Sequence, residues 1–382
     1  MNPTHRRRLL ARSLALLAAL GGPATLPRLA LARSRRAADA TGLGDYGNRR
    51  DVLHFVDELV TADGFSRAKL VHAFRKARFR AAIVEAMDRP LVAPPKWYEY
   101  APRFLNAGRI GGGVEFWRAN EPALSRAEAQ FGVPAEIVVA ILGVETYWGR
   151  NTGGYRVLDA LSTLAFDYPR RAAYFRGQLR EFLLFAREQG LPALTPLGSY
   201  AGAMGLPQFM PGNVRRYALD YDGDGKIDLW RSAADSIGSV ANYLARHDWL
   251  RGQPVWSRAI VAESAKDAAL ARLDGGVSER RPLDAWNADG VGAERMPVPM
   301  APQPVGLLML EEDPVAAGPD DETTTGEPAS LWIVFPNFYA ITRYNRSRLY
   351  AAAVTRLAEE LRAAQDALPP RAMHQGFERL RG

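Results

Sequence analysis

Near the middle of the chain is an apolar segment that no helix could expose to water. Pro134 fits the first turn of a helix, and apolar residues from Ile137 to Val144 follow it almost without interruption. Because apolar side chains surround such a helix on every side, it must be enclosed at the centre of a domain. We expect Gly149, Gly153 and Gly154 to end it. A chain of 382 residues is long enough for this core and for two or three lobes.

Glu145 is the acidic residue at the end of this segment. A carboxyl group there loses contact with water, which disfavours its charged form and raises its pKa. Cleavage of a glycosidic bond requires a general acid that keeps its proton near neutral pH. The aromatic pair Tyr147-Trp148 follows at once. The alternative is a glutamate that turns outward to solvent, and this position alone does not decide between the two.

The first 32 residues have the composition of an export signal. Arg6-Arg7-Arg8 forms a basic start, Leu9 to Leu20 is mainly apolar, and Ala30-Leu31-Ala32 matches a cleavage site. These features fit a twin-arginine signal and an ordinary secretory signal equally. No later stretch approaches 18 uninterrupted apolar residues. We therefore expect a cleaved signal peptide at residues 1–32 and a soluble periplasmic protein.

The basic character of the chain lies in this leader. Without its five arginines, the formal net charge falls from +7 to +2. The remaining body then has no overall charge suited to nucleic acid. The chain contains no cysteine, which excludes disulfides and a lipid-modified cysteine anchor. The expected mature protein is a monomer without a membrane anchor.

The rest of the chain has a mostly helical pattern with a minor β component. Helical spacing covers Asp51 to Met87, Leu161 to Gly190, Ser236 to His247 and Arg348 to Leu368. Gly111-Gly112-Gly113 is predicted to be a flexible joint. Beyond Gly252 the pattern favours a small strand-containing lobe, with a strand at Leu331 to Phe335 and an acidic mobile loop at Glu311 to Ser330.

Two further segments have side chains suited to a sugar site. Arg170 and Arg171 follow a proline, and paired guanidinium groups can hold a carboxylate. Ser199 and Gln208 border a loop of small residues, which lets backbone approach a ligand while the two side chains offer hydrogen bonds. The alternatives are a solvated arginine pair and an ordinary connection with Met204 and Phe209 in the core.

Four segments resemble the lytic murein transglycosylase B family, glycoside hydrolase family 103, and occur in the same order. They are Glu145-Thr146-x-Trp148-Gly149, Tyr168-Pro169-Arg170-Arg171, Gly202-Ala203-Met204-Gly205-x-x-Gln208-Phe209-Met210-Pro211 and Asn337-Phe338-Tyr339-x-Ile341-Thr342-Arg343-Tyr344-Asn345. The likeness extends from about Lys96 to the C-terminal helix.

The resemblance implies an α+β fold, mainly α, with a lysozyme-like catalytic core, a flanking helical lobe and a small β-containing lobe. The transglycosylase region is then 42–368, with the core at about 114–252, the β-containing lobe at about 253–335, a C-terminal segment 336–368 that packs back on the core and helical lobe, and a tail 369–382. The family's catalytic glutamate falls on Glu145. The predicted substrate-binding residues are Ser199, Gln208, Arg170, Arg171, Tyr100, Tyr243, Tyr339, Met204 and Phe209.

The implied reaction uses a single carboxyl group, whereas most glycosidases use two. Asp159, Asp167 and Glu181 lie near in sequence, but none has the setting of Glu145. The resemblance implies cleavage between N-acetylmuramic acid and N-acetylglucosamine with formation of a 1,6-anhydro end, and peptidoglycan strands and other cell-wall proteins as partners. A lysozyme-type hydrolase and a non-catalytic wall-binding protein remain the alternatives.

An acidic loop predicts a structural calcium site, with no cofactor for the chemistry. Asp220, Asp222, Asp224, Gly225 and Asp228 occupy positions 1, 3, 5, 6 and 9 of an EF-hand loop. Position 12 is Arg231 instead of glutamate, but the family is similar in closing a longer loop with a later aspartate. The predicted ligands are Asp220, Asp222, Asp224, Lys226 and Asp235 in the loop 220–235. The alternative is a hydrated Asp-Gly turn.

Overall fold

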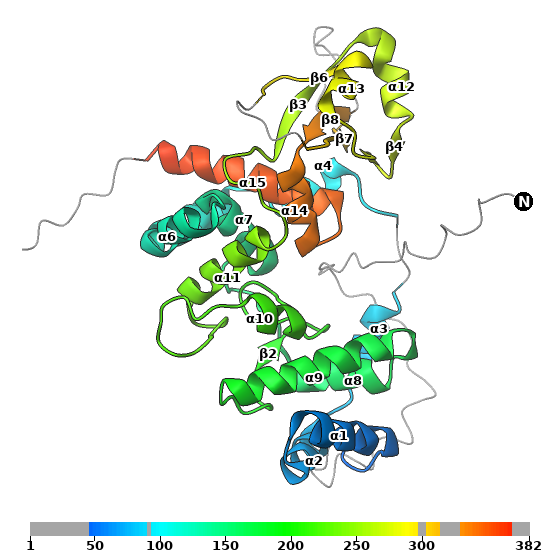
Figure 1. The fold of residues 1–382 in the computed structure, drawn as a ribbon, viewed down its shortest axis with the longest axis vertical. Coiled ribbons are helices and arrows are strands. Elements are labelled where there is room, and N and C mark those ends of the chain that lie inside the picture. Colours follow the sequence, from blue (N-terminus) through cyan, green and yellow to red (C-terminus); the bar gives the residue numbers. More distant parts are fainter. Residues whose placement is uncertain (1–45, 90–92, 297–302, 314–328, 369–382) are drawn as a thin grey trace, which may run out of the picture.

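The structure is a computed structural model that describes residues 46–89, 93–296, 303–313 and 329–368. Helices dominate these residues, and a sheet occupies one end of the molecule (Figure 1). The predicted signal peptide, the tail 369–382 and residues 314–328 of the predicted mobile loop lie outside the described residues.

A helical lobe lies at the end of the molecule opposite the sheet (Figure 1). Its first helix buries Val52, Phe55, Val56 and Leu59, which share one face at the three- and four-residue spacing of a helix. The lobe packs on a pair of long helices. The lobe and this pair lie in stretches for which the sequence predicts helices. Its helices are α1 (Arg50–Asp63), α2 (Arg67–Lys76) and α3 (Ala81–Met87), and the pair beneath is α8 (Val157–Phe166) and α9 (Ala172–Glu188), joined by the 3₁₀ turn η2 (Pro169–Arg171).

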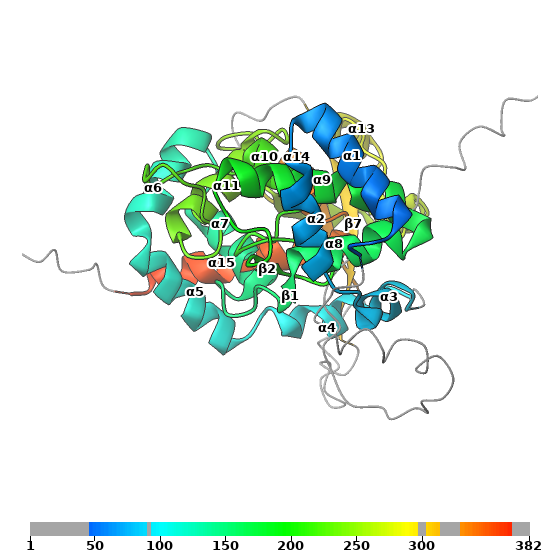
Figure 2. The ribbon, with the colours of Figure 1, turned by 90° about the horizontal axis from the view of Figure 1, so that it is seen from below.

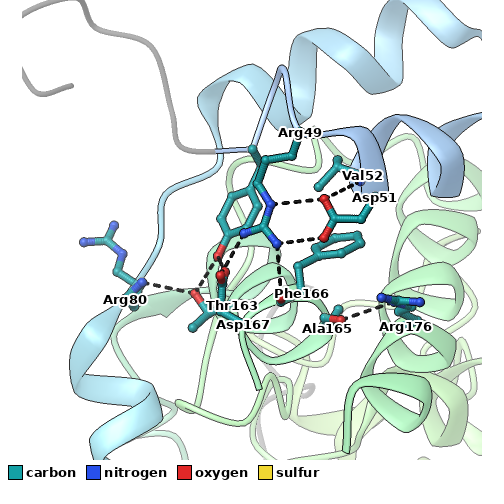
Figure 3. Close-up of polar contacts among 10 residues, drawn as sticks. Arg49, Asp51, Val52, Arg80, Thr163, Ala165, Phe166, Asp167 and Arg176 are labelled. Carbon is teal, nitrogen blue, oxygen red and sulfur yellow. Dashed lines mark hydrogen bonds and ion pairs between the residues drawn. The ribbon is translucent and has the colours of Figure 1, made fainter. Parts of the chain in front are cut away.

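Polar contacts fasten the start of the described chain to α8, as Figure 3 shows. The guanidinium of Arg49 lies 2.8 Å from Asp167 and 2.7 Å from Asp51. Tyr46 donates a hydrogen bond to Asp167 over 2.7 Å. The backbone N–H of Arg80 donates to the hydroxyl of Thr163 over 3.1 Å. The helical lobe is therefore fixed to the same helix pair at two separate places.

The apolar helix α7 (Ala135–Thr146) lies at the centre of the fold. Its residues from Ile137 to Val144 are all buried, as the sequence predicts. Four helices surround it: α5 (Ala107–Ala119), α6 (Glu121–Phe131), α11 (Ala233–Ala245) and α15 (Arg348–Asp366). Figures 1 and 2 both place α15 beside α7. A helix without a polar face is thus enclosed by packing partners on all sides.

The prediction of a flexible joint at Gly111-Gly112-Gly113 is wrong, because these residues lie inside α5. A Cβ atom on Gly113 would lie 2.3 Å from Leu361 and 2.8 Å from the ring of Trp148. Glycine is needed there for close packing of α5 against that ring and against α15, and the packing outweighs its poor helix propensity.

The predicted end of α7 is also displaced. The helix ends at Thr146, before the glycines, because Tyr147 and Trp148 both adopt the left-handed conformation with φ of 54°. Such backbone is unfavourable for bulky residues and persists only where the surroundings hold it. Here the indole N–H of Trp148 donates to the carbonyl of Val139 over 2.9 Å, and its ring packs over Gly143.

The segment between α7 and α11 forms the Gly-rich loop. A two-stranded pairing of β1 (Tyr155–Arg156) with β2 (Leu197–Gly198) opens it, and α10 (Pro211–Tyr217) closes it. Between them, Met204 forms antiparallel bridges with Gly198 and Phe209. The loop is therefore a compact folded unit held by backbone hydrogen bonds.

The small lobe contains a six-stranded antiparallel sheet in the order β4-β5-β7-β8-β3-β6. It has its own apolar core around the fully buried Trp286. The sheet falls within the stretch where the sequence predicts strands. Its elements are β3 (Trp256–Val261), η3 (Glu263–Ala265), α12 (Lys266–Leu270), β4 (Leu273–Asp274), β5 (Val277–Ser278), α13 (Leu283–Ala288), β6 (Val291–Ala293), β7 (Gly306–Glu311) and β8 (Ala329–Val334).

The last helices return the chain from the sheet to the core. Helix α14 (Pro336–Tyr344) leads into α15, which packs along α7 and α5, and the short helix α4 (Trp97–Tyr100) with η1 (Ala101–Arg103) contacts the sheet. Within the described residues, no single helix is both long and apolar enough to cross a membrane. One bent pair, Glu121–Phe131 with Ala135–Thr146, would pass by length and composition only.

Candidate active site

Glu145 occupies the last turn of α7, where its side chain is partly buried. Burial raises the pKa of this carboxyl from its usual 4.5 to about 7. The hydroxyl of Tyr350, on α15, donates a hydrogen bond to Glu145 Oε1 over 2.7 Å and acts in the opposite direction on the pKa. Glu145 can therefore keep its proton near neutral pH, as a general acid must, and can act as a base after it has given that proton away.

Tyrosine rings from three other elements gather around this carboxyl. Burial, with a smaller contribution from the negative charge of Glu145, raises the pKa of Tyr100 to about 12 and that of Tyr344 well above its usual 10. The same two causes, together with Tyr217, raise the pKa of Tyr243. The rings of Tyr243 and Tyr344 lie 5.0 Å apart, and Tyr344 stacks 6.3 Å from Tyr350. These rings therefore lie close enough to Glu145 to respond to its charge.

The Gly-rich loop places Ser199 and Gln208 with free hydrogen-bonding capacity. The Ser199 hydroxyl oxygen accepts from the backbone N–H groups of Ala201 and Ala203, so its proton remains able to donate. Gln208 Nε2 donates to the carbonyls of Thr152 and Gly205 over 3.1 and 2.9 Å. Within the described residues, its amide oxygen accepts no hydrogen bond. The amide nitrogen of Gln208 is thus fixed by the protein, and its oxygen is left to accept a hydrogen bond.

Backbone contacts fix this loop to the helix of Glu145. Thr146, the next residue, donates its hydroxyl proton to the carbonyl of Leu206 over 2.9 Å. The N–H of Leu206 in turn donates to the carbonyl of Leu229, within the acidic loop, over 2.8 Å. The acidic loop, the Gly-rich loop and the end of α7 are therefore held in one hydrogen-bonded series.

The predicted residues Met204 and Phe209 belong to the core. Met204 is fully buried and Phe209 is 2% exposed. The ring of Phe209 packs 5.3 Å from Tyr243 and 5.6 Å from Tyr344. In this arrangement the two side chains support the loop and the tyrosines from beneath.

Arg170 and Arg171 lie on η2, between α8 and α9. Arg170 is exposed and lies 3.4 Å from Asp88. Arg171 stacks 4.5 Å from the ring centre of Tyr174, and its buried Nη1 has no hydrogen-bond partner among the described residues. Their described contacts are with α9 and the segment after α3, and none is with Glu145.

Tyr339, the third predicted aromatic residue, faces the sheet lobe. Its ring lies 4.8 Å from the guanidinium of Arg280, and its hydroxyl is buried without a hydrogen-bond partner in the described part of the chain. A Cβ atom on Gly306 in β7 would lie only 2.1 Å from that hydroxyl. Tyr339 therefore sits at the contact between α14 and β7.

Asp159, Asp167 and Glu181 are all bound to arginines. Asp159 is fully buried and lies 2.6 Å from Arg80 and 2.8 Å from Arg156. Asp167 pairs with Arg49 at 2.8 Å, and Glu181 pairs with Arg215 at 2.6 Å. No second carboxylate contributes to the pKa of Glu145. The described residues thus contain one free buried acid at this site.

The acidic loop brings three carboxylates together. Oxygen atoms of Asp220, Asp222 and Asp235 lie within 4.8 Å of one another. Asp235 is 1% exposed, and burial raises its pKa although the backbone N–H groups of Asp228, Tyr221 and Asp222 point at it. Asp224 and Lys226 lie on the same loop but outside this cluster, where Asp224 accepts from the N–H of Lys226 over 2.9 Å.

The sequence did not point to Tyr350 as a site residue. It lies in α15, 205 residues beyond its partner Glu145, and nothing in the helical pattern separates it from other buried positions. Tyr344 lies inside one of the four motifs, which could have indicated it.

Glu145 is a partly buried acid at the end of a core helix, close to aromatic rings, and the next residue is bonded to a loop that has free polar groups. This is the arrangement expected of a lysozyme-like glycan-cleaving enzyme. Comparison with known proteins agrees. Residues 47–359 match the family model described as transglycosylase SLT domain. Membrane-bound lytic murein transglycosylase B of Escherichia coli is 38% identical over 332 residues, which are 84% of this chain and 85% of the relative.

Solved structures give the same result. The soluble lytic transglycosylase SltB1 from Pseudomonas aeruginosa is 45% identical, with a TM-score of 0.75 over 83% of this chain and 100% of that one. Slt35 from E. coli in complex with calcium is 38% identical, with a TM-score of 0.74 over 85% of this chain and 96% of that one. The chain therefore belongs to the transglycosylase SLT family and is a peptidoglycan lytic transglycosylase. The predicted fold class, α+β and mainly α with a lysozyme-like core, is confirmed.

Proposed function

We propose that Glu145 is the only catalytic acid and base, and that the enzyme cleaves between N-acetylmuramic acid and N-acetylglucosamine without water. The supporting observation is the setting of this carboxyl, which has a pKa of about 7 and no second carboxylate acting on it among the described residues. One acid/base fits a substrate-assisted route, an exception to the two-carboxylate rule.

In the first step, protonated Glu145 gives its proton to the bridging oxygen while the bond from C1 of muramic acid to that oxygen breaks. The N-acetyl group of the same sugar stabilises the cationic C1. The hydrogen bond from Tyr350 stabilises the carboxylate that forms, because a donor favours the charged form of an acid.

In the second step, the Glu145 carboxylate removes the proton of the C6 hydroxyl group on the same sugar. The C6 oxygen closes onto C1 and gives the 1,6-anhydro end, and Glu145 regains its proton for the next cycle. The aromatic walls of Tyr100, Tyr243 and Tyr344 keep competing water away.

Polar groups of the Gly-rich loop orient the muramic sugar. The free proton of Ser199 and the free amide oxygen of Gln208 suit the carbonyl and N–H of an N-acetyl group. Arg171, whose Nη1 has no partner in the part of the chain that the structure describes, and Arg170 suit a carboxylate of the substrate. Tyr100, Tyr243 and Tyr339 supply ring faces, Phe209 supports Tyr243, and Met204 supports the loop.

We also propose a structural calcium ion in the acidic loop. Three carboxylates within 4.8 Å would repel one another without a cation, and hard oxygen donors are what calcium prefers. Asp220, Asp222 and Asp235 would hold the ion, with Asp224 and the Lys226 carbonyl from the same loop as further ligands. The ion supplies charge compensation, and no step of the reaction uses it.

Export to the periplasm remains part of the proposal. The predicted leader lies outside the described residues, and we expect the mature chain to begin near Arg33 and to be recovered without detergent. N-terminal sequencing and cell fractionation test this. An uncleaved chain in the membrane fraction would show that the leader is an anchor.

Digestion of purified sacculi tests the reaction. Mass spectrometry of the products distinguishes 1,6-anhydro ends from the reducing ends of a hydrolase, and wild type is expected to release only the former. Reducing ends would identify a lysozyme-type enzyme, and no release would identify a wall-binding protein.

A further inference from the structure

Glu311 lies at the end of β7, where the sheet lobe meets the helical core (Figure 1). Its Oε1 atom accepts a hydrogen bond over 2.8 Å from Arg348, the first residue of α15. Its Oε2 atom accepts one over 3.3 Å from the backbone N–H of Trp97, the first residue of α4. The first N–H groups of a helix have no partner inside it, and the carboxylate supplies an acceptor for one of them. One side chain of the sheet lobe thus joins the first turns of two helices.

The sheet lobe also holds Arg348 at two other points. Its Nη1 atom donates to the carbonyl of Met309 over 2.8 Å. The turn between β4 and β5 passes over the guanidinium at Gly276, where φ is 86° and a Cβ atom would lie 2.5 Å from Arg348 Cζ. The side chains of Arg348 and Glu311 are only 15% and 22% exposed. The pair is therefore largely shielded from water, which strengthens its hydrogen bonds relative to those of a surface pair.

The carboxyl group of Glu311 is held in its charged form. Burial by itself would raise its pKa, but Arg348 and the N–H groups of Glu311 and Trp97 together keep that pKa below its usual value. Both of its oxygen atoms therefore accept hydrogen bonds as a carboxylate at neutral pH.

The two helices joined in this way carry tyrosines of the site. Tyr350 lies two residues after Arg348, within the same turn of α15, and donates its hydroxyl proton to Glu145 over 2.7 Å. Tyr100 lies three residues after Trp97, and its pKa responds to burial and then to the charge of Glu145. A displacement of the first turn of α15 would therefore move the hydroxyl group that is bonded to Glu145.

Four elements bring titratable groups that respond to the charge of Glu145. They are Tyr100 on α4, Tyr243 on α11, Tyr344 on α14 and Tyr350 on α15. Within the described residues, the pKa of Glu145 depends first on burial and then, in the opposite direction, on the hydrogen bond from Tyr350. The Glu311–Arg348 pair makes no direct contribution to it. An effect of this pair on Glu145 must therefore pass through Tyr350.

We propose that Glu311 is a positioning residue, which holds the hydroxyl of Tyr350 on Glu145 by fixing the first turn of α15 to the sheet and to α4. The proposal rests on the function proposed above, in which Glu145 is the acid. An arginine fork fits a carboxylate in a defined orientation, and the N–H of Trp97 keeps the second oxygen of that carboxylate from turning away. The sheet lobe thereby acts on the reaction without contacting the substrate at Glu145.

The pH profile of kcat/KM tests this role. Glu311→Gln keeps the size of the side chain and removes the charge that holds Arg348. The basic limb, where Glu145 loses its proton, should move upward by roughly half a pH unit, which is about half of the shift expected when the Tyr350 hydrogen bond is lost entirely. Arg348→Gln breaks the same pair from the other side and should give the same shift. A limb that stays in place in both folded variants would overturn the proposal.

The double variant Glu311→Gln/Tyr350→Phe separates positioning from a general loss of structure. If Glu311 acts through Tyr350, the double variant should have the same basic limb as Tyr350→Phe alone, because the hydrogen bond can be lost only once. A further shift in the double variant would refute the role of Glu311, since its charge would then reach Glu145 by another route.

A matched control uses the ion pair of Arg362 with Glu136, which joins the later part of α15 to the start of α7 over 2.6 Å. The side chain of Glu136 is 20% exposed, close to the 22% of Glu311. Glu136→Gln should cost a comparable amount of stability in urea denaturation and leave the basic limb in place. An equal shift in this variant would mean that any loosening of α15 has the same effect, which would remove the particular role of Glu311.

Direct titration of Glu145 separates this proposal from the proposed reaction. NMR of protein with ¹³C-labelled glutamate follows this carboxyl group without turnover, and the Glu145→Gln spectrum identifies its signal. A pKa that is higher in Glu311→Gln than in wild type supports the positioning role even if the products show another reaction. Anhydro products together with a titration that Glu311→Gln leaves unchanged would support the reaction and refute the role of Glu311.

Discussion

The end of α7 and the start of α8 each hold an acid away from solvent, with opposite results. Asp159 in α8 is fully buried, pairs with Arg80 and Arg156, and accepts from the backbone N–H of Arg78 over 3.1 Å. Glu145 in α7 has tyrosine rings around it and one hydroxyl donor. Burial therefore raises the pKa of Glu145, which has no compensating cation, whereas Asp159 and its two arginines form a structural joint.

The largest effect should follow from Glu145→Gln. The change keeps the shape of the side chain and removes the proton that the reaction transfers. Turnover should fall by roughly 10²–10⁴-fold, the usual contribution of general acid/base catalysis. Muropeptide release from sacculi measures this, and retention of a tenth of the wild-type rate would show that another group can act.

The same variant should change stability in a pH-dependent direction. The folded-state pKa of Glu145, about 7, lies above its usual 4.5, so the folded chain binds this proton more tightly than the unfolded chain. The contribution of this group to the free energy of unfolding is fully present below about pH 4.5 and is lost as the pH rises through about 7. Glu145→Gln should therefore melt above wild type at pH 8 and show a smaller difference at pH 5.

Asp159→Asn should give the opposite result, a large loss of stability with the chemistry intact. It leaves two guanidiniums without their counter-charge in a joint between the helical lobe and α8. Breaking a buried pair costs about 3–5 kcal/mol, and the partly exposed arginines reduce this to about 2–3 kcal/mol. Urea denaturation measures the loss. If the folded fraction lost its turnover as well, Asp159 would have a role beyond structure.

Asp235 adds a third kind of buried acid, one whose partner would be a metal ion. At a calcium concentration about 100 times the dissociation constant, binding would add roughly 2.7 kcal/mol to the free energy of unfolding. Wild type should melt higher in calcium than in chelator, and Asp222→Asn should lose most of this difference. Identical melting of wild type in both buffers would reduce the loop to an acidic turn.

Tyr350→Phe should have the smallest effect, on the pH profile. The Tyr350 hydrogen bond lowers the pKa of Glu145 against the effect of burial, so its removal raises that pKa further. The basic limb of kcat/KM, where the acid loses its proton, should move upward by about one pH unit. A limb that stays in place would mean that the hydrogen bond does not act on the free enzyme.

The sequence predicted the parts of the site that are local in the chain. An apolar helix with one acid at its end specifies both its burial and the unusual carboxyl, because each follows from side chains within a few turns. The loop of small residues placed Ser199 and Gln208 close together in the sequence, and the structure gives both of them free hydrogen-bonding capacity. Their contacts with a substrate remain predictions.

What the sequence could not supply depends on partners far along the chain. In the sequence alone, Gly113 and its neighbours predict a flexible joint. Only the packing of Trp148 and Leu361 against Gly113 shows why glycine is needed inside a helix. No feature of the sequence around Tyr350 indicates a role in the site, because only the packing of α15 on α7 brings its hydroxyl to Glu145. The left-handed backbone at Tyr147 likewise follows from the anchoring of Trp148 and not from its own preference.

The contact of α15 with α7 also has a consequence for the order in which the site forms during synthesis. An emerging chain completes α7 more than 200 residues before Tyr350 leaves the ribosome, and until then one side of an all-apolar helix has no cover. The acid is then exposed to water, so its pKa returns toward the ordinary value. A chain that has not yet docked α15 is therefore expected to lack the raised pKa at Glu145 and, with it, the acid proposed above for the reaction.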